Sequence, residues 1–470
     1  MALPDLLRGA QPPFTERKNG LGLRKNRELP YDSERSLALF DKITNSVPHQ
    51  VRESSRLLVE KAFGDLLAKP ERLRGRADSA FLIHTRRFPQ NDGLGLPPSH
   101  PALDDAGMCF PALSLRYGIP DKAVEEFWET LPPFQAGTIG GFMPDGTPVT
   151  TALISVPITP TGLFASVHDG IAGPRNYALP RIRAAVDLAN KFGAQEGFIG
   201  LGETLASLTN HGRILLQEYP DNDFNTGHAF TTLMIQRWVE EAARLKERDL
   251  ADLKITILGA AGAIGRATLG FLVDKGIDPS HIILYDKLGA EDRILRNLRE
   301  FGLDERGATI LTGDMFGMDG KLKQACGDAD LLVSGMSTPF PIVKAEYLKR
   351  GASYIDDSMP PTLTREEADK ADVSVFWVVG RLPDGMIRDL DYGLKGNTGE
   401  WGCAAETVAM TTLKKRGQKG VLDTVGPVTP ERVTIAGKIA DEMGIGLGEP
   451  QSYGLPTSVS TGGTLVEFSA

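Results

Sequence analysis

The sequence is poor in cysteine: Cys109, Cys326 and Cys403 are the only three among 470 residues. An odd and widely spaced set of thiols does not fit a disulfide framework, and it lacks the paired spacing of a structural zinc site. The His, Asp and Glu residues show no metal-ligand spacing either, so we expect no metal. Any cysteine chemistry in this chain has to come from a single thiol.

Long apolar runs are also missing. No stretch approaches the length that crosses a bilayer, and residues 1–8 lack the basic start and apolar core of a secretion signal. We therefore expect no membrane span and a cytoplasmic location. The chain has 52 Lys+Arg against 61 Asp+Glu, a formal net charge of -9. Because binding to phosphates needs clustered Lys and Arg, nucleic acid is not an expected partner.

The length and the composition shifts predict several domains, because 470 residues exceed one ordinary hydrophobic core. Residues 1–80 are expected to form an N-terminal helical extension, and residues 81–230 a substrate-binding domain. A Rossmann dinucleotide-binding domain is expected over 231–402. Residues 403–470 would supply two C-terminal helices and a flexible tail rich in Gly, Ser and Thr from 456 to 463.

Short β-type runs alternate with helical patterns in the second half of the chain. That alternation predicts a parallel sheet with helices on both faces. The expected fold class is α/β, with a Rossmann-type doubly wound parallel sheet and a separate N-terminal α/β substrate domain. The six strands are expected at 255–258, 282–285, 308–311, 331–334, 353–355 and 373–379.

The first of these strands runs into GAAGAIG, the glycine spacing of a dinucleotide-binding turn. Gly259 would make the tight turn, Gly262 would let backbone amides approach a pyrophosphate, and Gly265 would let helix and strand pack closely. Ala261 and Ile264 would supply turn backbone at the positive end of the following helix. An ordinary strand-to-helix turn is the alternative interpretation.

The second strand ends at Asp286, where an acidic side chain would accept a hydrogen bond from a ribose 2′-hydroxyl. An acid there repels the 2′-phosphate of NADPH and favours NADH, whereas Lys287 and Arg293 would compensate. The loop after the fourth strand, with Ser334 and Met336, is expected near the nicotinamide. The sequence thus predicts a nicotinamide dinucleotide and leaves the choice between NADH and NADPH open.

Among the thiols, Cys403 has the most suggestive surroundings, because a glycine-rich loop becomes a helix at the cysteine itself. There the thiol would face unpaired backbone amides, which favour thiolate and could hold an oxyanion. Glu406 would lie on the same face of the first turn, either for proton transfer or for plain first-turn capping. The alternative for Cys403 is an inert buried thiol, which is what we expect of Cys326 and Cys109.

Polar residues gather around one glycine where a long amphipathic helix begins. Asn225 and Thr226 are placed to touch a substrate, unless the group is only an N-cap cluster. His228 is the imidazole that we rank first for proton donation, ahead of His84 and His211.

Taken in order, several motifs resemble those of the long-chain acyl-[acyl-carrier-protein] reductases, a family of aldehyde-forming enzymes. The matching stretches run from about residue 81 to about residue 451. They are 116–128 with 131–133, 224–228, the turn around Gly259, Cys403-Ala-Ala-Glu406, and 428–440.

The resemblance implies that Cys403 takes an acyl group from an acyl carrier protein or coenzyme A thioester. A nicotinamide hydride then releases the aldehyde. The family has a basic residue after the second strand, which implies NADPH, and Asp286 departs from that pattern. Residues 1–80 have no counterpart in the family, and they would dock a carrier protein, cover the substrate entrance or mediate homo-oligomerisation.

Two other functions fit the same residues. The first is a non-covalent Rossmann dehydrogenase that acts on a carbonyl or hydroxy acid, with Cys403 structural. The second is a non-catalytic protein that senses nucleotides or binds a carrier.

Overall fold

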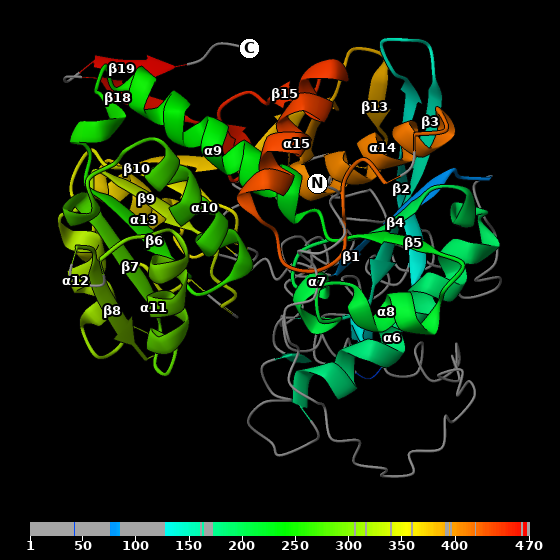
Figure 1. Ribbon diagram of the computed structural model, residues 1–470, viewed down its shortest axis with the longest axis horizontal. Helices are drawn as coiled ribbons and strands as arrows, with labels where there is room; N and C mark the ends of the chain where they lie inside the picture. The colour runs from blue at the N-terminus through cyan, green and yellow to red at the C-terminus, as the bar shows by residue number, and fades with distance from the viewer. Residues whose placement is uncertain are drawn as a thin grey trace, which may run out of the picture.

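The computed structural model describes residues 42, 76–84, 127–159, 162–163, 173–304, 307–314, 317–338, 341–358, 361–390, 394, 397–418, 420–461 and 464–467 (Figure 1). The helical extension expected over 1–80 lies almost wholly outside these ranges, as do Cys109 and most of the matching stretch 116–128.

Six parallel strands form the sheet of the dinucleotide-binding unit, in the order β11-β10-β9-β6-β7-β8. The first strand of the unit lies in the middle and the chain winds outward from it on both sides, which is the doubly wound order of a Rossmann fold. The predicted fold class is confirmed. The strands are β6 (Ile255–Leu258), β7 (Ile282–Lys287), β8 (Thr309–Gly313), β9 (Leu331–Ser334), β10 (Ser353–Asp356) and β11 (Ser374–Trp377).

The central strands are buried along their whole length, as expected for a parallel sheet that helices cover on both faces. The run expected at 373–379 is divided, because the chain leaves the sheet after Trp377 and β12 begins at Val379. The connecting helices are α10 (Ala263–Asp274), α11 (Glu291–Glu300), α12 (Lys321–Gly327) and α13 (Arg365–Ala371).

A second six-stranded sheet, in the order β13-β2-β3-β1-β4-β5, forms the other half of the molecule. The strands β1, β3, β4 and β5 run parallel, whereas β2 and β13 are antiparallel to their neighbours. The bounds are β1 (Ser79–His84), β2 (Phe134–Phe142), β3 (Pro148–Val156), β4 (Phe198–Leu201), β5 (Asp223–Asn225) and β13 (Met386–Arg388).

The segment 231–402, expected to form one Rossmann domain, contributes to both sheets. Its strand β13 pairs with β2 through Met386 and Gly141, and so extends the N-terminal sheet. The sequence pattern does not show this pairing, because a three-residue edge strand carries too little periodicity to identify its partner.

Three helices lie between the two sheets (Figure 1). The helix α9 (His228–Leu245) contacts α10, α14 and α15, and it stacks Trp238 on Phe376 of β11. The helix α14 (Gly402–Lys415) packs against β1, β3 and β4, while α15 (Pro430–Glu442) packs on α9. The remaining helices of four or more residues are α6 (Gly173–Lys191), α7 (Leu205–Leu208) and α8 (Arg213–Glu218).

The C-terminal segment expected to be a flexible tail is ordered into strands. A backbone hydrogen bond from Thr457 to Pro450 and a hydroxyl bond from Thr457 to the Val375 carbonyl fix its start against β11. The short strands are β12 (Val379–Arg381), β14 (Gly399–Trp401), β15 (Gly446–Leu447), β16 (Gln451–Ser452), β17 (Leu455–Pro456), β18 (Ser458–Thr461) and β19 (Thr464–Glu467).

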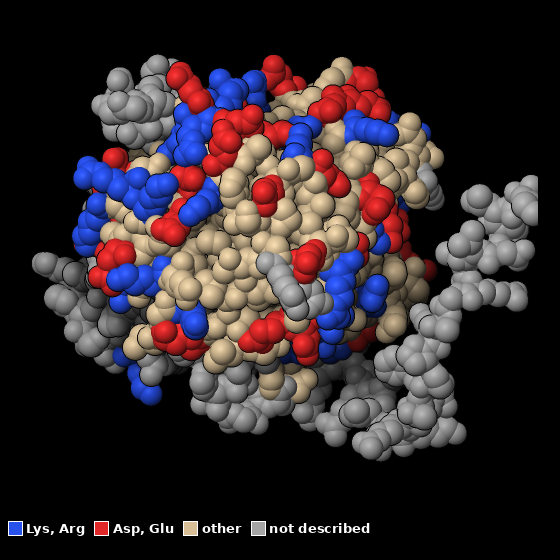
Figure 2. All heavy atoms as spheres, turned by 60° about the vertical axis from the view of Figure 1, so that its left-hand side comes forward, with Lys and Arg blue, Asp and Glu red and all other residues tan. Residues whose placement is uncertain are grey.

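Among the described helices, none combines the length and hydropathy that crossing a bilayer requires. On the face over the Rossmann unit, Lys and Arg are intermixed with Asp and Glu (Figure 2). No single sign of charge gathers on that face.

Candidate active site

The glycine turn joins β6 to α10 and shapes the space in front of that helix. Gly259 has φ 87, and a Cβ on it would lie 3.1 Å from the Gly335 carbonyl oxygen. A Cβ on Gly265 would lie 2.3 Å from the Gly259 oxygen, so α10 can pack on the turn only with glycine there. A Cβ on Gly262 would have a single neighbour within 4 Å, the Gly259 oxygen at 3.2 Å. The N-terminus of α10 is therefore open on its outer side, and an anion could approach the amides of Ile264 and its neighbours.

Asp286, at the end of β7, is fastened to this turn. Its carboxylate accepts one hydrogen bond from the Ala261 amide and another from the Lys287 amide, both at 2.8 Å. The side chain of Asp286 thus stands beside the turn at the carboxyl edge of the sheet, while Lys287 is exposed. That is the position in which a carboxylate meets the ribose of a dinucleotide.

Ser334, predicted to lie near the nicotinamide, has its side chain inside the protein. Its hydroxyl is fully buried and lies 2.8 Å from the Ser358 hydroxyl and 3.0 Å from that of Thr362. The Ser334 hydroxyl therefore fixes the loop that follows β10. In the loop after β9, Met336 is half-buried.

Cys403 is the second residue of α14 and lies where the carboxyl ends of strands from both sheets meet. The turn after β5 packs directly on it, since a Cβ on Gly227 would lie 2.2 Å from the Cys403 Cβ and 2.4 Å from its Cα. Glu203 follows β4, and Asp357 follows β10 of the Rossmann sheet. Both carboxylates act electrostatically on the thiol. The half-buried Cys403 is thus reached from both halves of the molecule.

The environment of Cys403 does not favour thiolate, contrary to the expectation from its place at a helix start. Burial raises the pKa of the Cys403 thiol well above its ordinary value, and the charges of Asp357, Glu203 and Glu400 raise it further. A backbone hydrogen bond from Glu203 acts in the opposite direction. Three carboxylates outweigh the helix amides, so the resting group is a thiol. Burial also raises the pKa of Cys326, to about 12, as expected of an inert thiol.

Glu406 caps the start of α9 instead of its own helix. Its carboxylate accepts hydrogen bonds from the Gly227 amide at 3.2 Å and from the Phe230 amide at 3.0 Å. Burial raises the pKa of Glu406 to about 7, even though the amides oppose that shift. The first-turn capping proposed for this residue is therefore wrong in its target, because the tertiary fold brings a second helix end closer than α14's own amides.

Asn225 and Thr226 are buried beneath the thiol. The Asn225 amide group donates to Glu406 at 3.4 Å and accepts from the Thr407 hydroxyl at 3.1 Å, which ties β5 to α14. Thr226 donates its backbone amide to Thr424 at 3.0 Å. With these contacts, both residues hold the turn that presses on Cys403.

His228 is the first residue of α9, adjacent to Gly227. Burial lowers the pKa of His228 to about 3, with a smaller contribution from His211, whose ring centroid lies 5.4 Å away. The imidazole is neutral at physiological pH and cannot serve as an imidazolium acid. The sequence ranking is also changed by His84, whose Nδ1 lies 2.9 Å from the Glu203 carboxylate beside the thiol.

The depressed pKa of His228 predicts acid sensitivity. Because the unfolded chain takes up this proton near pH 6.5 and the folded chain only near pH 3, stability should fall as pH drops through that window. The loss is on the order of 4 kcal/mol at the acid end. Glu406, with its raised pKa, acts in the opposite direction, so the comparison is with His228→Gln. Urea unfolding from pH 7.5 to 4 should show a shallower decline in the variant, and parallel curves would contradict this assignment.

Sequence reasoning missed Glu203, Asp357 and Glu400. The first two come directly after parallel strands, and polar residues at that position are a recognisable indication of a site in α/β sheets. Glu400 is fully buried, with its carboxylate 3.7 Å from the Arg388 guanidinium. Nothing in the local sequence indicates that pair.

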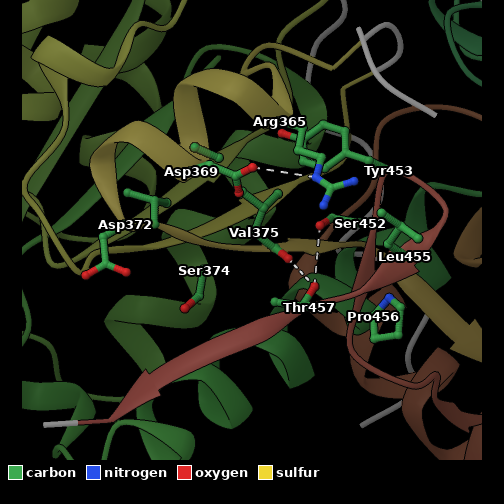
Figure 3. A pocket seen from close by; sticks show the side chains of 12 residues that line it. Arg365, Asp369, Asp372, Ser374, Val375, Ser452, Tyr453, Leu455, Pro456 and Thr457 are labelled. Atoms are coloured by element: carbon green, nitrogen blue, oxygen red, sulfur yellow. Dashed lines mark hydrogen bonds and ion pairs between the residues drawn. The ribbon is translucent and has the colours of Figure 1, made fainter. Parts of the chain in front are cut away.

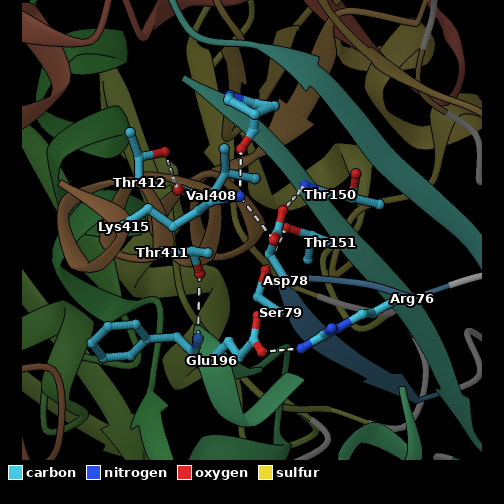
Figure 4. Close-up of polar contacts among 12 residues, drawn as sticks. Arg76, Asp78, Ser79, Thr150, Thr151, Glu196, Val408, Thr411, Thr412 and Lys415 are labelled. Carbon is cyan, nitrogen blue, oxygen red and sulfur yellow. Dashed lines mark hydrogen bonds and ion pairs between the residues drawn. The ribbon is translucent and has the colours of Figure 1, made fainter. Parts of the chain in front are cut away.

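The far end of α14 is anchored on the N-terminal sheet (Figure 4). The Lys415 ammonium lies 2.8 Å from the Asp78 carboxylate, which in turn accepts the Thr150 amide at 2.8 Å. The Thr411 hydroxyl accepts the Phe198 amide at 3.3 Å. These contacts join α14 to β3 and β4 and so fix the helix that carries Cys403.

A separate pocket of about 230 Å³ lies between α13 and the C-terminal strands (Figure 3). Arg365, Asp369, Ser452 and Thr457 are among its lining residues, and none of the predicted site residues is. No group of three or more His, Cys, Asp and Glu within the described part of the chain could hold a metal ion.

Comparisons with known proteins show no matching family model and no matching curated protein. Among solved structures, malic enzyme from Pyrococcus horikoshii is 15% identical, with 88% of this chain and 86% of that one covered and a TM-score of 0.32. Shikimate 5-dehydrogenase from Listeria monocytogenes, solved with shikimate and NAD, is 14% identical over 42% and 59%, with a TM-score of 0.25.

One of the dipicolinate synthase polypeptides from Bacillus halodurans is 12% identical, with a TM-score of 0.26. The match spans 40% of this chain and 60% of that protein's length. These scores are low, so the assignment of the fold rests on the strand order described above.

Proposed function

We propose that this protein is a nicotinamide-dependent oxidoreductase that reduces an acyl thioester, carried by acyl carrier protein or coenzyme A, to an aldehyde. Cys403 would carry the acyl group between the two half-reactions. The observation that supports this most is the position of Cys403, with Glu203 on one side and Asp357 of the Rossmann sheet on the other. Ligands of α/β sheets bind beyond the carboxyl ends of the strands, where this thiol lies.

The residues of the glycine turn fit a dinucleotide. The open N-terminus of α10 would hold the pyrophosphate next to Gly262, and Asp286 would accept hydrogen bonds from a ribose. The bound cofactor, NADH or NADPH, would supply the hydride. The chain's own contribution is to orient that cofactor toward the Cys403 side of the sheet edge.

The side chains around Cys403 position and shield it. Gly227 lets the turn after β5 lie against the cysteine backbone, and Glu406 locks that turn to the start of α9. A bound acyl group would occupy the side of the thiol that faces Asp357. Transthioesterification keeps the acyl group activated and places it near the hydride donor, which replaces an encounter in solution by a step within one complex.

A non-covalent dehydrogenase is the second candidate, and one observation favours it. The raised pKa of Cys403 keeps the thiol protonated at rest, which suits a structural cysteine. In that case the carbonyl substrate would bind between Asp357 and the cofactor without a bond to sulfur.

Mass spectrometry of the intact protein separates the two candidates. After incubation with palmitoyl coenzyme A and without reduced cofactor, we expect one acyl adduct, located on Cys403 by peptide mapping. The buried Cys326 serves as an internal control, since its thiol is fully buried and should stay unmodified. The absence of an adduct with acyl chains of several lengths, together with turnover of those substrates, would establish the non-covalent mechanism.

Asp286 should set the cofactor preference. Replacement by alanine removes the charge that repels a 2′-phosphate, so the ratio of NADPH to NADH affinity should rise about tenfold. Alanine also removes the acceptor of the Ala261 amide, which Asp286→Asn retains. Titration of both cofactors by fluorescence would therefore compare the two variants. An unchanged ratio in both would remove Asp286 from the cofactor site.

A further inference from the structure

Cys403 needs a proton acceptor because its surroundings leave it as a thiol. Four carboxylates lie around it or its supporting turn: Glu203, Asp357, Glu400 and Glu406. Each has different contacts, and these decide which one can accept the proton. A base for Cys403 deepens the proposed function and rests on it.

Two of the four are committed elsewhere. Glu406 accepts the amides at the start of α9, at 3.2 Å from Gly227 and 3.0 Å from Phe230. Glu400 is fully buried beside Arg388 and accepts the Trp401 amide at 2.9 Å. Protonation of either would break contacts that hold the backbone around Cys403.

Asp357 is a poor acceptor for a different reason. Burial raises the pKa of Asp357 well above its ordinary value, and the charges of Asp356 and Glu203 raise it further. Asp357 therefore keeps its own proton more tightly than an ordinary carboxyl group, which makes it the neutral partner of this cluster.

Glu203 has the contacts of a base. Its backbone amide donates to the Cys403 thiol, and its carboxylate lies 2.9 Å from His84 Nδ1. His84 Nε2 lies 2.8 Å from the Thr204 hydroxyl, and the His84 side chain is 1% exposed. Glu203 also has φ 52, a left-handed conformation that is uncommon for a residue other than glycine.

We propose that the Glu203 carboxylate is the general base for Cys403 and that His84 is the positioning residue that holds this carboxylate. The S–H bond of Cys403 breaks, the proton passes to Glu203, and the sulfur forms a bond to the acyl carbonyl carbon. The bond from that carbon to the carrier sulfur then breaks, and Glu203 returns the proton to the departing thiolate. No net oxidation occurs in this step.

The test measures the rate at which Cys403 acquires a palmitoyl group from palmitoyl coenzyme A, by mass spectrometry of the full-length protein. We expect Glu203→Gln to slow this rate by about 10²-fold. A carboxylate that only raises the pKa of the thiol predicts the opposite, since its removal would ease thiolate formation and speed acylation. An unchanged or faster rate in Glu203→Gln therefore overturns the proposal.

Further variants separate the base from the backbone. Glu203→Gly keeps the amide and tolerates φ 52, so it should be as slow as Glu203→Gln if the carboxylate matters. His84→Phe should slow acylation about tenfold, while His84→Asn, which can still donate to Glu203, should restore most of the rate. Asp357→Asn should keep or raise it. A slow Asp357→Asn with a normal Glu203→Gln would assign the base to Asp357 and overturn the proposal.

The pH profile gives a readout that a purely structural role would not change. Without Glu203 the thiolate has to form in solution equilibrium, so acylation should rise about tenfold per pH unit below the thiol pKa. Alkylation of Cys403 by iodoacetamide reports the same proton transfer without an acyl substrate. If wild type forms no acyl adduct but alkylates faster than Glu203→Gln, the proposed function fails and the base assignment stands. If the variant alkylates as fast as wild type, the base assignment fails.

Discussion

Replacement of Cys403 by alanine is expected to lower kcat for the reduction of a long-chain acyl thioester by about 10³-fold or more. The physical reason is that the acyl group would lose its covalent attachment next to the hydride donor, and both half-reactions depend on that attachment. Initial rates with palmitoyl coenzyme A and reduced cofactor measure the effect.

Binding of the reduced cofactor should survive in the same variant, because the glycine turn and Asp286 lie on the other sheet. Cys326→Ala is the matched control, since that thiol is fully buried and lies beneath β6, where Thr256 contacts the same helix. It should lose stability and keep its specific activity. Turnover by Cys403→Ala above one tenth of the wild-type rate would favour the non-covalent dehydrogenase.

Replacement of Gly227 by alanine is expected to lower the free energy of unfolding by about 3 kcal/mol and to abolish acylation of Cys403. Two costs add at this position. The residue has φ 72, which disfavours any side chain, and its added methyl would lie 2.2 Å from the Cys403 Cβ. Either the turn after β5 or the start of α14 has to move, and both carry the site.

Gly320→Ala isolates the first of these costs. Gly320 also precedes a helix and has φ 76, but nothing lies within 4 Å of the added methyl group. We expect this control to lose about 1 kcal/mol and to keep its activity. Urea unfolding and acylation rates of the two variants would show the contact term by difference. Equal losses of stability would mean that the turn yields to Cys403 without consequence.

Much of the Rossmann unit could be predicted from local sequence. Apolar runs with helical segments between them gave the strands, and the glycine turn and Asp286 were recognisable from their spacing. The reason is that steric limits at glycine and the burial of both strand faces act within a few residues. The C-terminal strands were not predicted, because Thr457 is held by the Val375 carbonyl, a contact that the composition of the tail does not reveal.

The sequence by itself determined the fold of the cofactor unit, the position of its turn, and Cys403 as the thiol at a helix start. Only the tertiary structure decided the state of that thiol. Asp357, Glu203 and Glu400 come from separate strand ends, and their charges act through space on a sulfur that local sequence would have made a thiolate. Glu406 caps a helix other than its own for the same reason. Electrostatics and capping depend on which groups are near, and nearness between distant segments is set by the packing of the two sheets.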